Sequence, residues 1–220
     1  MNIYIIAQDL DLCDQGEDRF FKLGRKLNSR GHDVTVFTVS GAVDLDLGKK
    51  KIGLVQKNGL KVIAFNVGRD PRRGGFKKLF ACLKFARMTW RQGQRHPRPD
   101  LVIAASPPLT AVLSALKLTE YYRVPLVMEV RELWPGGNLC NGVLTKACQR
   151  MAQKTYEQAG RIIACRPEIA AAIKERPVEP DKVQVIEDRG DERLLIEKYE
   201  GAIEELTVKN KNSPHREEGK

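Results

Sequence analysis

Short, continuously apolar runs alternate with longer segments of helical periodicity along most of this chain. An apolar run without polar alternation is typical of a strand that is buried on both faces, as happens where helices cover both sides of a parallel sheet. The runs of this kind are NIYIIA, DVTVFTV, DLVIAA, PLVMEV, GRIIAC and KVQVI. The alternation therefore predicts a doubly wound α/β fold with a mostly parallel, Rossmann-like sheet.

The segments between the strands predict helices and one hairpin. Phe20, Leu23 and Leu27 recur at helical spacing after the first apolar run. Asn58-Gly59 separates two alternating apolar runs and is a dipeptide typical of a tight type I′ hairpin turn. One antiparallel pair is thus expected within the otherwise parallel sheet.

Composition narrows the class of protein. A hydrophobic content of 42% is enough to form a core. Because no run of 18 apolar residues occurs and an aspartate soon follows the first run, we expect neither a transmembrane helix nor a signal peptide, and a cytoplasmic protein. The 5 cysteines never form C-x-x-C and the 3 histidines lie far apart, so neither a disulfide framework nor a metal site is predicted.

One segment makes the chain basic. The formal net charge is +10, and residues 69–98 alone hold ten basic residues and one acidic residue. We expect this segment to form a helix whose most apolar face covers the sheet. The residues of that face are Phe76, Leu79, Phe80, Leu83, Ala86 and Trp90.

The other face of this helix mixes basic and apolar side chains, which is typical of a helix resting on an anionic membrane surface. The residues assigned to this membrane surface are Lys77, Lys78, Lys84, Phe85, Arg87, Met88 and Arg91. The alternative is a solvated basic face that keeps the protein soluble. Nucleic-acid binding is not predicted, because no stacking aromatic residues or recognised binding module accompany the charge.

Polar groups follow three of the predicted strands. They lie in QDLDLCDQGED, in SPPL and in EVRELWPGG, and ligands of doubly wound sheets bind where such loops leave the carboxyl ends of the strands. No G-x-G-x-x-G or P-loop motif occurs, so neither a dinucleotide cradle nor a P-loop phosphate cradle is predicted.

Taken together, these pieces resemble the N-terminal half of family-4 glycosyltransferases of the GT-B fold, of the polysaccharide-biosynthesis type. The resemblance covers roughly residues 1–191 and is most specific where SPPL is followed by EVRELWP. It implies a single GT-B N-terminal-type domain over 1–191. The residues that follow, 192–220, predict one helix from about Glu192 to Leu206 and then a charged tail that we expect to be disordered.

The resemblance also implies a function. The chain would be the acceptor-binding half of a hexosyltransferase that moves a sugar from a nucleotide sugar to a lipid-linked glycan at the inner membrane face. A separate donor-binding domain would be its partner. We expect this chain to bind no cofactor itself, since the nucleotide sugar enters as a co-substrate through that partner domain. Two alternatives stay open: a non-catalytic module that binds a membrane or a glycan, and a truncated remnant of a full-length enzyme.

EVRELWPGG is the loop with a cluster of reactive groups, since two glutamates flank an arginine in it. Activating an acceptor hydroxyl requires a carboxylate or an imidazole within hydrogen-bond reach. We assign Glu132 to acceptor binding or base catalysis, and Arg131 to a phosphate or to orienting a carboxylate. The alternative is that Glu129 and Arg131, on the same side of the strand, form an internal ion pair while Trp134 caps the sheet.

The other two loops also allow two interpretations each. The first loop either contacts the acceptor or caps the helix that follows it. Ser106 either binds a ligand at the next helix N-terminus or is the N-cap of that helix, with proline at its first position. The predicted acceptor-binding residues are Asp14, Gln15, Gly16, Ser106, Glu129, Arg131 and Trp134.

Overall fold

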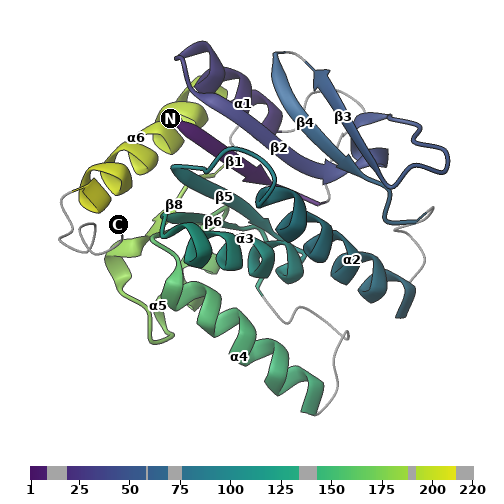
Figure 1. Ribbon diagram of the computed structural model, residues 1–220. Helices are drawn as coiled ribbons and strands as arrows, with labels where there is room; N and C mark the ends of the chain where they lie inside the picture. Colours follow the sequence, from purple (N-terminus) through teal and green to yellow (C-terminus); the bar gives the residue numbers. More distant parts are fainter. Residues whose placement is uncertain (9–18, 58, 69–75, 134–142, 188–191, 212–220) are drawn as a thin grey trace, which may run out of the picture.

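The structure, a computed structural model, describes residues 1–8, 19–57, 59–68, 76–133, 143–187 and 192–211 (Figure 1). Within these residues, eight strands form one sheet in the order β3-β4-β2-β1-β5-β6-β7-β8. Every neighbouring pair is parallel except β3 and β4. The strands are β1 Asn2–Ile6, β2 Asp33–Val39, β3 Ile52–Lys57, β4 Leu60–Phe65, β5 Leu101–Ser106, β6 Leu126–Val130, β7 Arg161–Ala164 and β8 Val183–Val185. The predicted doubly wound α/β fold is confirmed.

Helices cover both faces of the sheet and create two apolar cores. One core lies against α2, α3, α4 and α5, and the other lies against α1, η1 and α6. The helices are α1 Arg19–Ser29, η1 Ser40–Val43, α2 Phe76–Gly93, α3 Leu109–Tyr122, α4 Val143–Gln158, α5 Pro167–Lys174, η3 Pro180–Lys182 and α6 Glu192–Lys211. The continuously apolar strands follow from this arrangement, since both of their faces are buried.

The predicted hairpin forms one edge of the sheet. Strand β3 pairs antiparallel with β4, and Lys57 is the partner of Leu60 next to the turn. Gly59 has a φ of +82°, in the left-handed region where glycine is favoured over other residues. Asn58 lies outside the described residues.

Helix α6 belongs to the same packed unit as the rest of the chain. The predicted helix is present and extends to Lys211. Four of its buried side chains join the core beside α1, and they are Ile196, Tyr199, Ile203 and Leu206. Helix α6 therefore packs against the rest of the chain, and the predicted division into domains stays a prediction. Residues 212–220 lie outside the described part of the chain.

Helix α2 is rotated relative to the sequence prediction. Leu79, Phe80 and Leu83 are 49%, 70% and 52% exposed, although they were expected to cover the sheet. Phe85, expected on the outer face, is fully buried, with its ring centroid 5.6 Å from that of Phe65. Met88 is half-buried and packs against the same core.

Side-chain size explains the rotation of α2. The buried face of α2 carries the smaller residues Cys82, Thr89 and Gly93 as well as Phe85. A Cβ at Gly93 would lie 2.7 Å from Leu118 Cδ2, so a larger residue there would push α2 away from α3. A helical wheel ranks faces by hydrophobicity and takes no account of this close approach.

Candidate functional site

The predicted site lies at the carboxyl edge of the sheet, where the parallel strands end. The exits of β5 and β6 are adjacent there, because the Arg131 backbone N–H donates to the Ser106 carbonyl at 2.9 Å. The structure therefore brings two of the three predicted loops together at their described ends. Asp14, Gln15, Gly16 and Trp134, and the side chains of Lys77 and Lys78, lie outside the described residues, so their roles stay predictions.

Glu129 is a buried structural carboxylate. Its side chain is fully buried, and its Oε1 accepts a hydrogen bond from Arg131 Nε at 2.7 Å. Its Oε2 accepts a hydrogen bond from the Tyr199 hydroxyl and lies 3.3 Å from Arg19 Nη2. The internal ion pair of Glu129 and Arg131 is thus confirmed. Because both carboxylate oxygens are taken up inside the protein, the acceptor-binding role expected of Glu129 is not supported.

Glu129 forms the centre of a larger group that we call the Glu129 cluster, made of Arg19, Glu129, Arg131, Cys165 and Tyr199. Arg19 donates to the Tyr199 hydroxyl at 2.7 Å and to Cys165 Sγ at 3.4 Å. The cluster connects the start of α1, the ends of β6 and β7, and the middle of α6. It therefore fixes α6 against the edge where the predicted acceptor loops leave the sheet.

The surroundings of the cluster keep its two weak acids neutral. Burial and the charge of Glu129 raise the pKa of the Cys165 thiol to about 12. The same two causes raise the pKa of Tyr199 well above its usual value. Burial alone would lower the pKa of Arg19, but Glu129, Tyr199 and Cys165 together raise it. Cys165 therefore stays a thiol near neutral pH, which does not suit a nucleophile.

Sequence reasoning missed Arg19, Cys165 and Tyr199 as members of this cluster. Tyr199 lies 70 positions from Glu129, and Arg19 lies 180 positions from Tyr199. Each residue also fits an ordinary amphipathic helix or strand end, so no local spacing connects them.

Glu132 and Arg131 begin the loop after β6. Glu132 is exposed, and the Arg131 side chain keeps 21% of its surface accessible while it holds Glu129. Among the described residues at this strand exit, Glu132 is therefore the carboxylate that is open to a ligand, whereas the guanidinium of Arg131 donates to Glu129.

Ser106 is the last residue of β5 and is buried. Helix α3 begins at Leu109 with Pro108 at its N-cap, and no side chain caps it. The N-cap interpretation of Ser106 is therefore wrong, because two prolines, each after a cis peptide bond, separate the serine from the helix. A ligand role for Ser106 stays a prediction.

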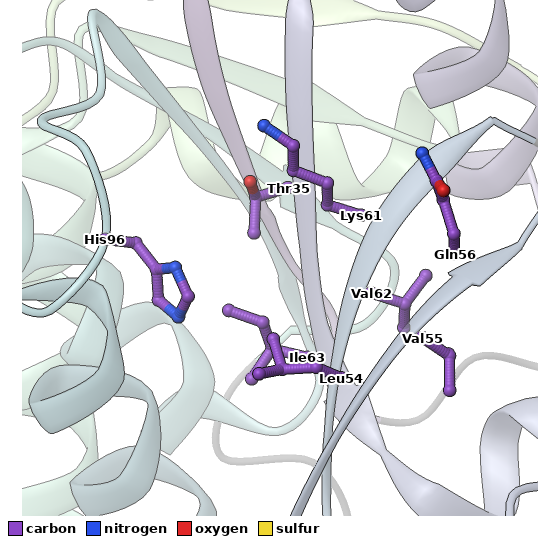
Figure 2. Close-up of a pocket in the computed structure, with 8 residues that line it drawn as sticks. All are labelled: Thr35, Leu54, Val55, Gln56, Lys61, Val62, Ile63 and His96. Atoms are coloured by element: carbon purple, nitrogen blue, oxygen red, sulfur yellow. The ribbon is translucent and has the colours of Figure 1, made fainter.

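A shallow groove of about 360 Å³ lies at the opposite end of the sheet (Figure 2). His96, in the connection between α2 and β5, faces strand residues that include Thr35 and Lys61 near the starts of β2 and β4. Burial, and then the charge of Lys61, lower the pKa of His96. The lining residues are Thr35, Leu54, Val55, Gln56, Lys61, Val62, Ile63 and His96. None of them belongs to the predicted acceptor loops, so the groove is separate from the candidate site.

Within the described residues, no three or more histidine, cysteine, aspartate or glutamate side chains come together in a way that could hold a metal ion. No helix in this part of the chain has the length and apolar character needed to cross a membrane.

Comparison with protein families identifies the domain. Residues 17–188 match the family described as the glycosyl transferase 4-like domain. The chain belongs to this family. The resemblance to the N-terminal domain of family-4 GT-B glycosyltransferases is thereby confirmed. No curated protein matches the chain.

Solved structures share the fold of this glycosyltransferase domain at low sequence identity. A sucrose-phosphate synthase structure from Thermosynechococcus elongatus matches with a TM-score of 0.62 and 13% identity, over 94% of this chain and 99% of that one. The catalytic domain of starch synthase IV from Arabidopsis thaliana matches at 0.56 and 11%, over 84% of this chain and 51% of that one. A UDP-GlcNAc 2-epimerase from Neisseria meningitidis matches at 0.52 and 12%, over 95% and 51%. The chain thus spans about half the length of the last two.

Proposed function

We propose that this chain is the acceptor-binding half of a GT-B glycosyltransferase and that a second domain supplies the nucleotide sugar. The observation that carries the proposal is the junction of the β5 and β6 exits, made by the Arg131 to Ser106 backbone bond, in a chain of the glycosyl transferase 4-like family. A second domain is supported by the starch synthase and epimerase structures, because the match takes in about half of each of those chains.

In this proposal Glu132 is the catalytic base. The acceptor oxygen attacks the anomeric carbon of the donor sugar, the bond to the nucleoside diphosphate breaks, and Glu132 takes the hydroxyl proton. An exposed carboxylate at the loop start can reach an acceptor. Glu129 is fully buried and the Cys165 thiol has a raised pKa, so neither neighbour suits the task.

The proposed acceptor is a lipid-linked glycan at the inner face of a membrane. Arg87 and Arg91 are exposed and Lys84 is partly exposed on the outer side of α2. Basic side chains at these positions would attract an anionic lipid surface. In this proposal Arg131, the residue before Glu132, would bind a phosphate of the acceptor.

The test combines this chain with a separately expressed donor domain, a labelled nucleotide sugar and a lipid-linked acceptor. We expect sugar transfer in the mixture and none from either part alone. Glu132→Gln should lower the rate of transfer by about 100-fold or more. Glu175→Gln is the matched control, because Glu175 is exposed at the end of α5 and should leave the rate unchanged.

The outcomes separate the parts of the proposal. Transfer that survives Glu132→Gln would remove the base assignment and leave the transferase. Membrane binding without transfer by any mixture would instead favour a non-catalytic binding module, the second candidate function, which the exposed apolar residues of α2 support.

A further inference from the structure

The outer side of α2 carries a cluster of apolar side chains that the fold leaves uncovered. Large exposed apolar side chains elsewhere in the described residues are scattered, at positions such as Leu54 and Val208. Leu79, Phe80 and Leu83 instead lie within two turns of one helix and are each about half or more exposed. Single exposed apolar residues are ordinary, whereas a cluster marks an interaction surface.

Basic residues continue the same side of the helix. Leu83, Arg87 and Arg91 are spaced four apart and therefore follow one stripe along α2. Both arginines are exposed, and Lys84 is partly exposed beside them. We call Leu79, Phe80, Leu83, Lys84, Arg87 and Arg91 the docking face.

We propose that the docking face binds the surface of an anionic lipid bilayer, with Leu79, Phe80 and Leu83 entering the headgroup region and the basic residues contacting lipid phosphates. The inference rests on the proposed function, because it names the surface through which the domain would reach a lipid-linked acceptor. Apolar side chains beside cations are the composition of helices that lie in a membrane interface.

The direction of α2 decides which end of the sheet meets the bilayer. Gln8, just beyond the end of β1, donates a hydrogen bond to Cys82 Sγ at 3.5 Å. Tyr4, inside β1, donates to the Gly93 carbonyl at 3.2 Å. The apolar half of the docking face therefore lies toward the carboxyl edge, where the acceptor loops begin, and Figure 1 shows α2 running in this direction.

A second basic group lies at the same edge. Lys49, Lys50 and Lys51 are consecutive and exposed just before β3. Asn66, just after β4, donates from its backbone N–H to the Lys51 carbonyl at 3.0 Å and from its side chain to the Gly48 carbonyl at 3.2 Å. These bonds hold the lysine triplet at the carboxyl end of β4. Two separate contacts would fix the orientation of the domain on the bilayer, with the acceptor loops near the lipid headgroups.

Charge favours a bilayer over a second copy of the chain as the occupant. The charged residues of the docking face and the lysine triplet are all positive. Two such faces would repel each other, whereas an anionic bilayer attracts both groups.

The test is co-sedimentation of the full chain with vesicles of phosphatidylcholine, alone or mixed with phosphatidylglycerol. We expect binding to the anionic vesicles only, and weaker binding at high salt. Phe80→Ser with Leu83→Ser should weaken binding by about ten-fold or more, because less apolar surface enters the interface. Replacing the three lysines by glutamine should also weaken it, by about 100-fold, since each contributes about five-fold.

Matched controls come from the other face of the sheet. Val208 is 58% exposed on α6, and Lys26 is exposed on α1. Val208→Ser and Lys26→Gln should leave vesicle binding unchanged. The denaturation midpoint of every variant should equal that of the parent chain, so that a loss of binding does not reflect a loss of folding.

Equal binding to both vesicle types, no binding to either, or full binding by the Phe80 and Leu83 variant would each overturn the proposal. So would concentration-dependent dimerisation that the same variant abolishes, which would assign the face to a second copy. Transfer to a short-chain soluble acceptor separates this proposal from the proposed function. The variant with Phe80→Ser and Leu83→Ser should keep such transfer. Vesicle binding without any sugar transfer would contradict the proposed transferase function and leave the membrane proposal standing.

Discussion

The Glu129 cluster and the docking face both gather cationic side chains, yet they use them in opposite ways. In the cluster, Arg19 and Arg131 hold a carboxylate that is 0% exposed. In the docking face, Arg87 and Arg91 are exposed beside apolar side chains. A charge that is paired in the interior supports the fold, whereas a charge left on the surface is available to a partner.

The largest loss of stability is expected from a substitution of Glu129, at the centre of the cluster. Glu129→Gln should lower the free energy of unfolding by about 3–5 kcal/mol, because it leaves two largely buried guanidinium groups without their carboxylate. Urea denaturation measures the change. The exposed Glu132→Gln is the control and should alter stability by less than about 0.5 kcal/mol. If the two substitutions lowered the free energy of unfolding equally, the contrast between buried and exposed charges would be contradicted.

Two phenylalanines of α2 sharpen the comparison within one helix. Phe85→Ala should cost about 3–5 kcal/mol, because Phe85 is fully buried, while Phe80→Ala should cost less than about 0.5 kcal/mol, since Phe80 is 70% exposed. Thermal or chemical denaturation of the two variants compares them directly. A larger loss of stability from Phe80→Ala than from Phe85→Ala would instead support the helix face predicted from the sequence.

The predicted face of α2 was wrong at Leu79, Phe80 and Leu83 for a physical reason, whereas Trp90 packs against the core as predicted. A wheel selects the most apolar stripe, and this helix has a strongly apolar stripe through Phe80 and Leu83 that the fold leaves outside. The buried stripe is less apolar, but several of its side chains are small. Cys82, Thr89 and Gly93 allow the helix to pack closely. Which stripe is buried depends on the shape of α3 and the sheet, and this shape is not encoded within α2 itself.

A smaller effect is expected where α6 meets the cluster. Tyr199→Phe should lower stability by about 1.5–3 kcal/mol, because it removes a hydroxyl that donates to Glu129 and accepts from Arg19. Tyr121→Phe should have almost no effect, since Tyr121 is 59% exposed. A Tyr199 variant as stable as the parent chain would show that α6 is held by apolar packing alone.

The last prediction is a loss of stability at alkaline pH. The pKa of Cys165 is about 12 in the fold and 9.0 ordinarily, so the unfolded chain loses this proton first as pH rises. The stability contributed by the neutral thiol is complete below about pH 9 and declines from there toward about pH 12. Tyr199 acts in the same direction above its ordinary value of 10.0.

Denaturation midpoints between about pH 8 and pH 11 test this dependence. The decline should be shallower in Cys165→Ala, which lacks the thiol. A variant that declines as steeply as the parent chain would assign the alkaline loss to other groups.

The strands of the sheet could be predicted because each one is encoded locally. A strand buried on both faces must be apolar throughout, and the runs from NIYIIA to KVQVI each form a strand of the sheet. The hairpin was equally local, since its turn needs a residue such as Gly59 with positive φ. The pair of Glu129 and Arg131 was predictable as an alternative, because residues two apart on a strand share a side.

The rest of the site could not be predicted because its partners are distant in the sequence. Arg19 and Tyr199 meet across 180 positions, and only the order of the strands brings α1 and α6 together. Ser106 was misplaced as a helix cap because the strand continues through it and the helix begins after the second proline.

The packing of α6 beside α1 makes the folding unit longer than the span by which the family is recognised. The family match ends at residue 188, but the last helix covers an apolar strip and supplies the hydroxyl that completes a buried carboxylate's bonding. A chain cut at residue 188 would lack α6 and would expose apolar side chains in the core that α1 and α6 share. An expressed fragment that ends at residue 188 would therefore lack the α6 side chains that belong to the hydrophobic core.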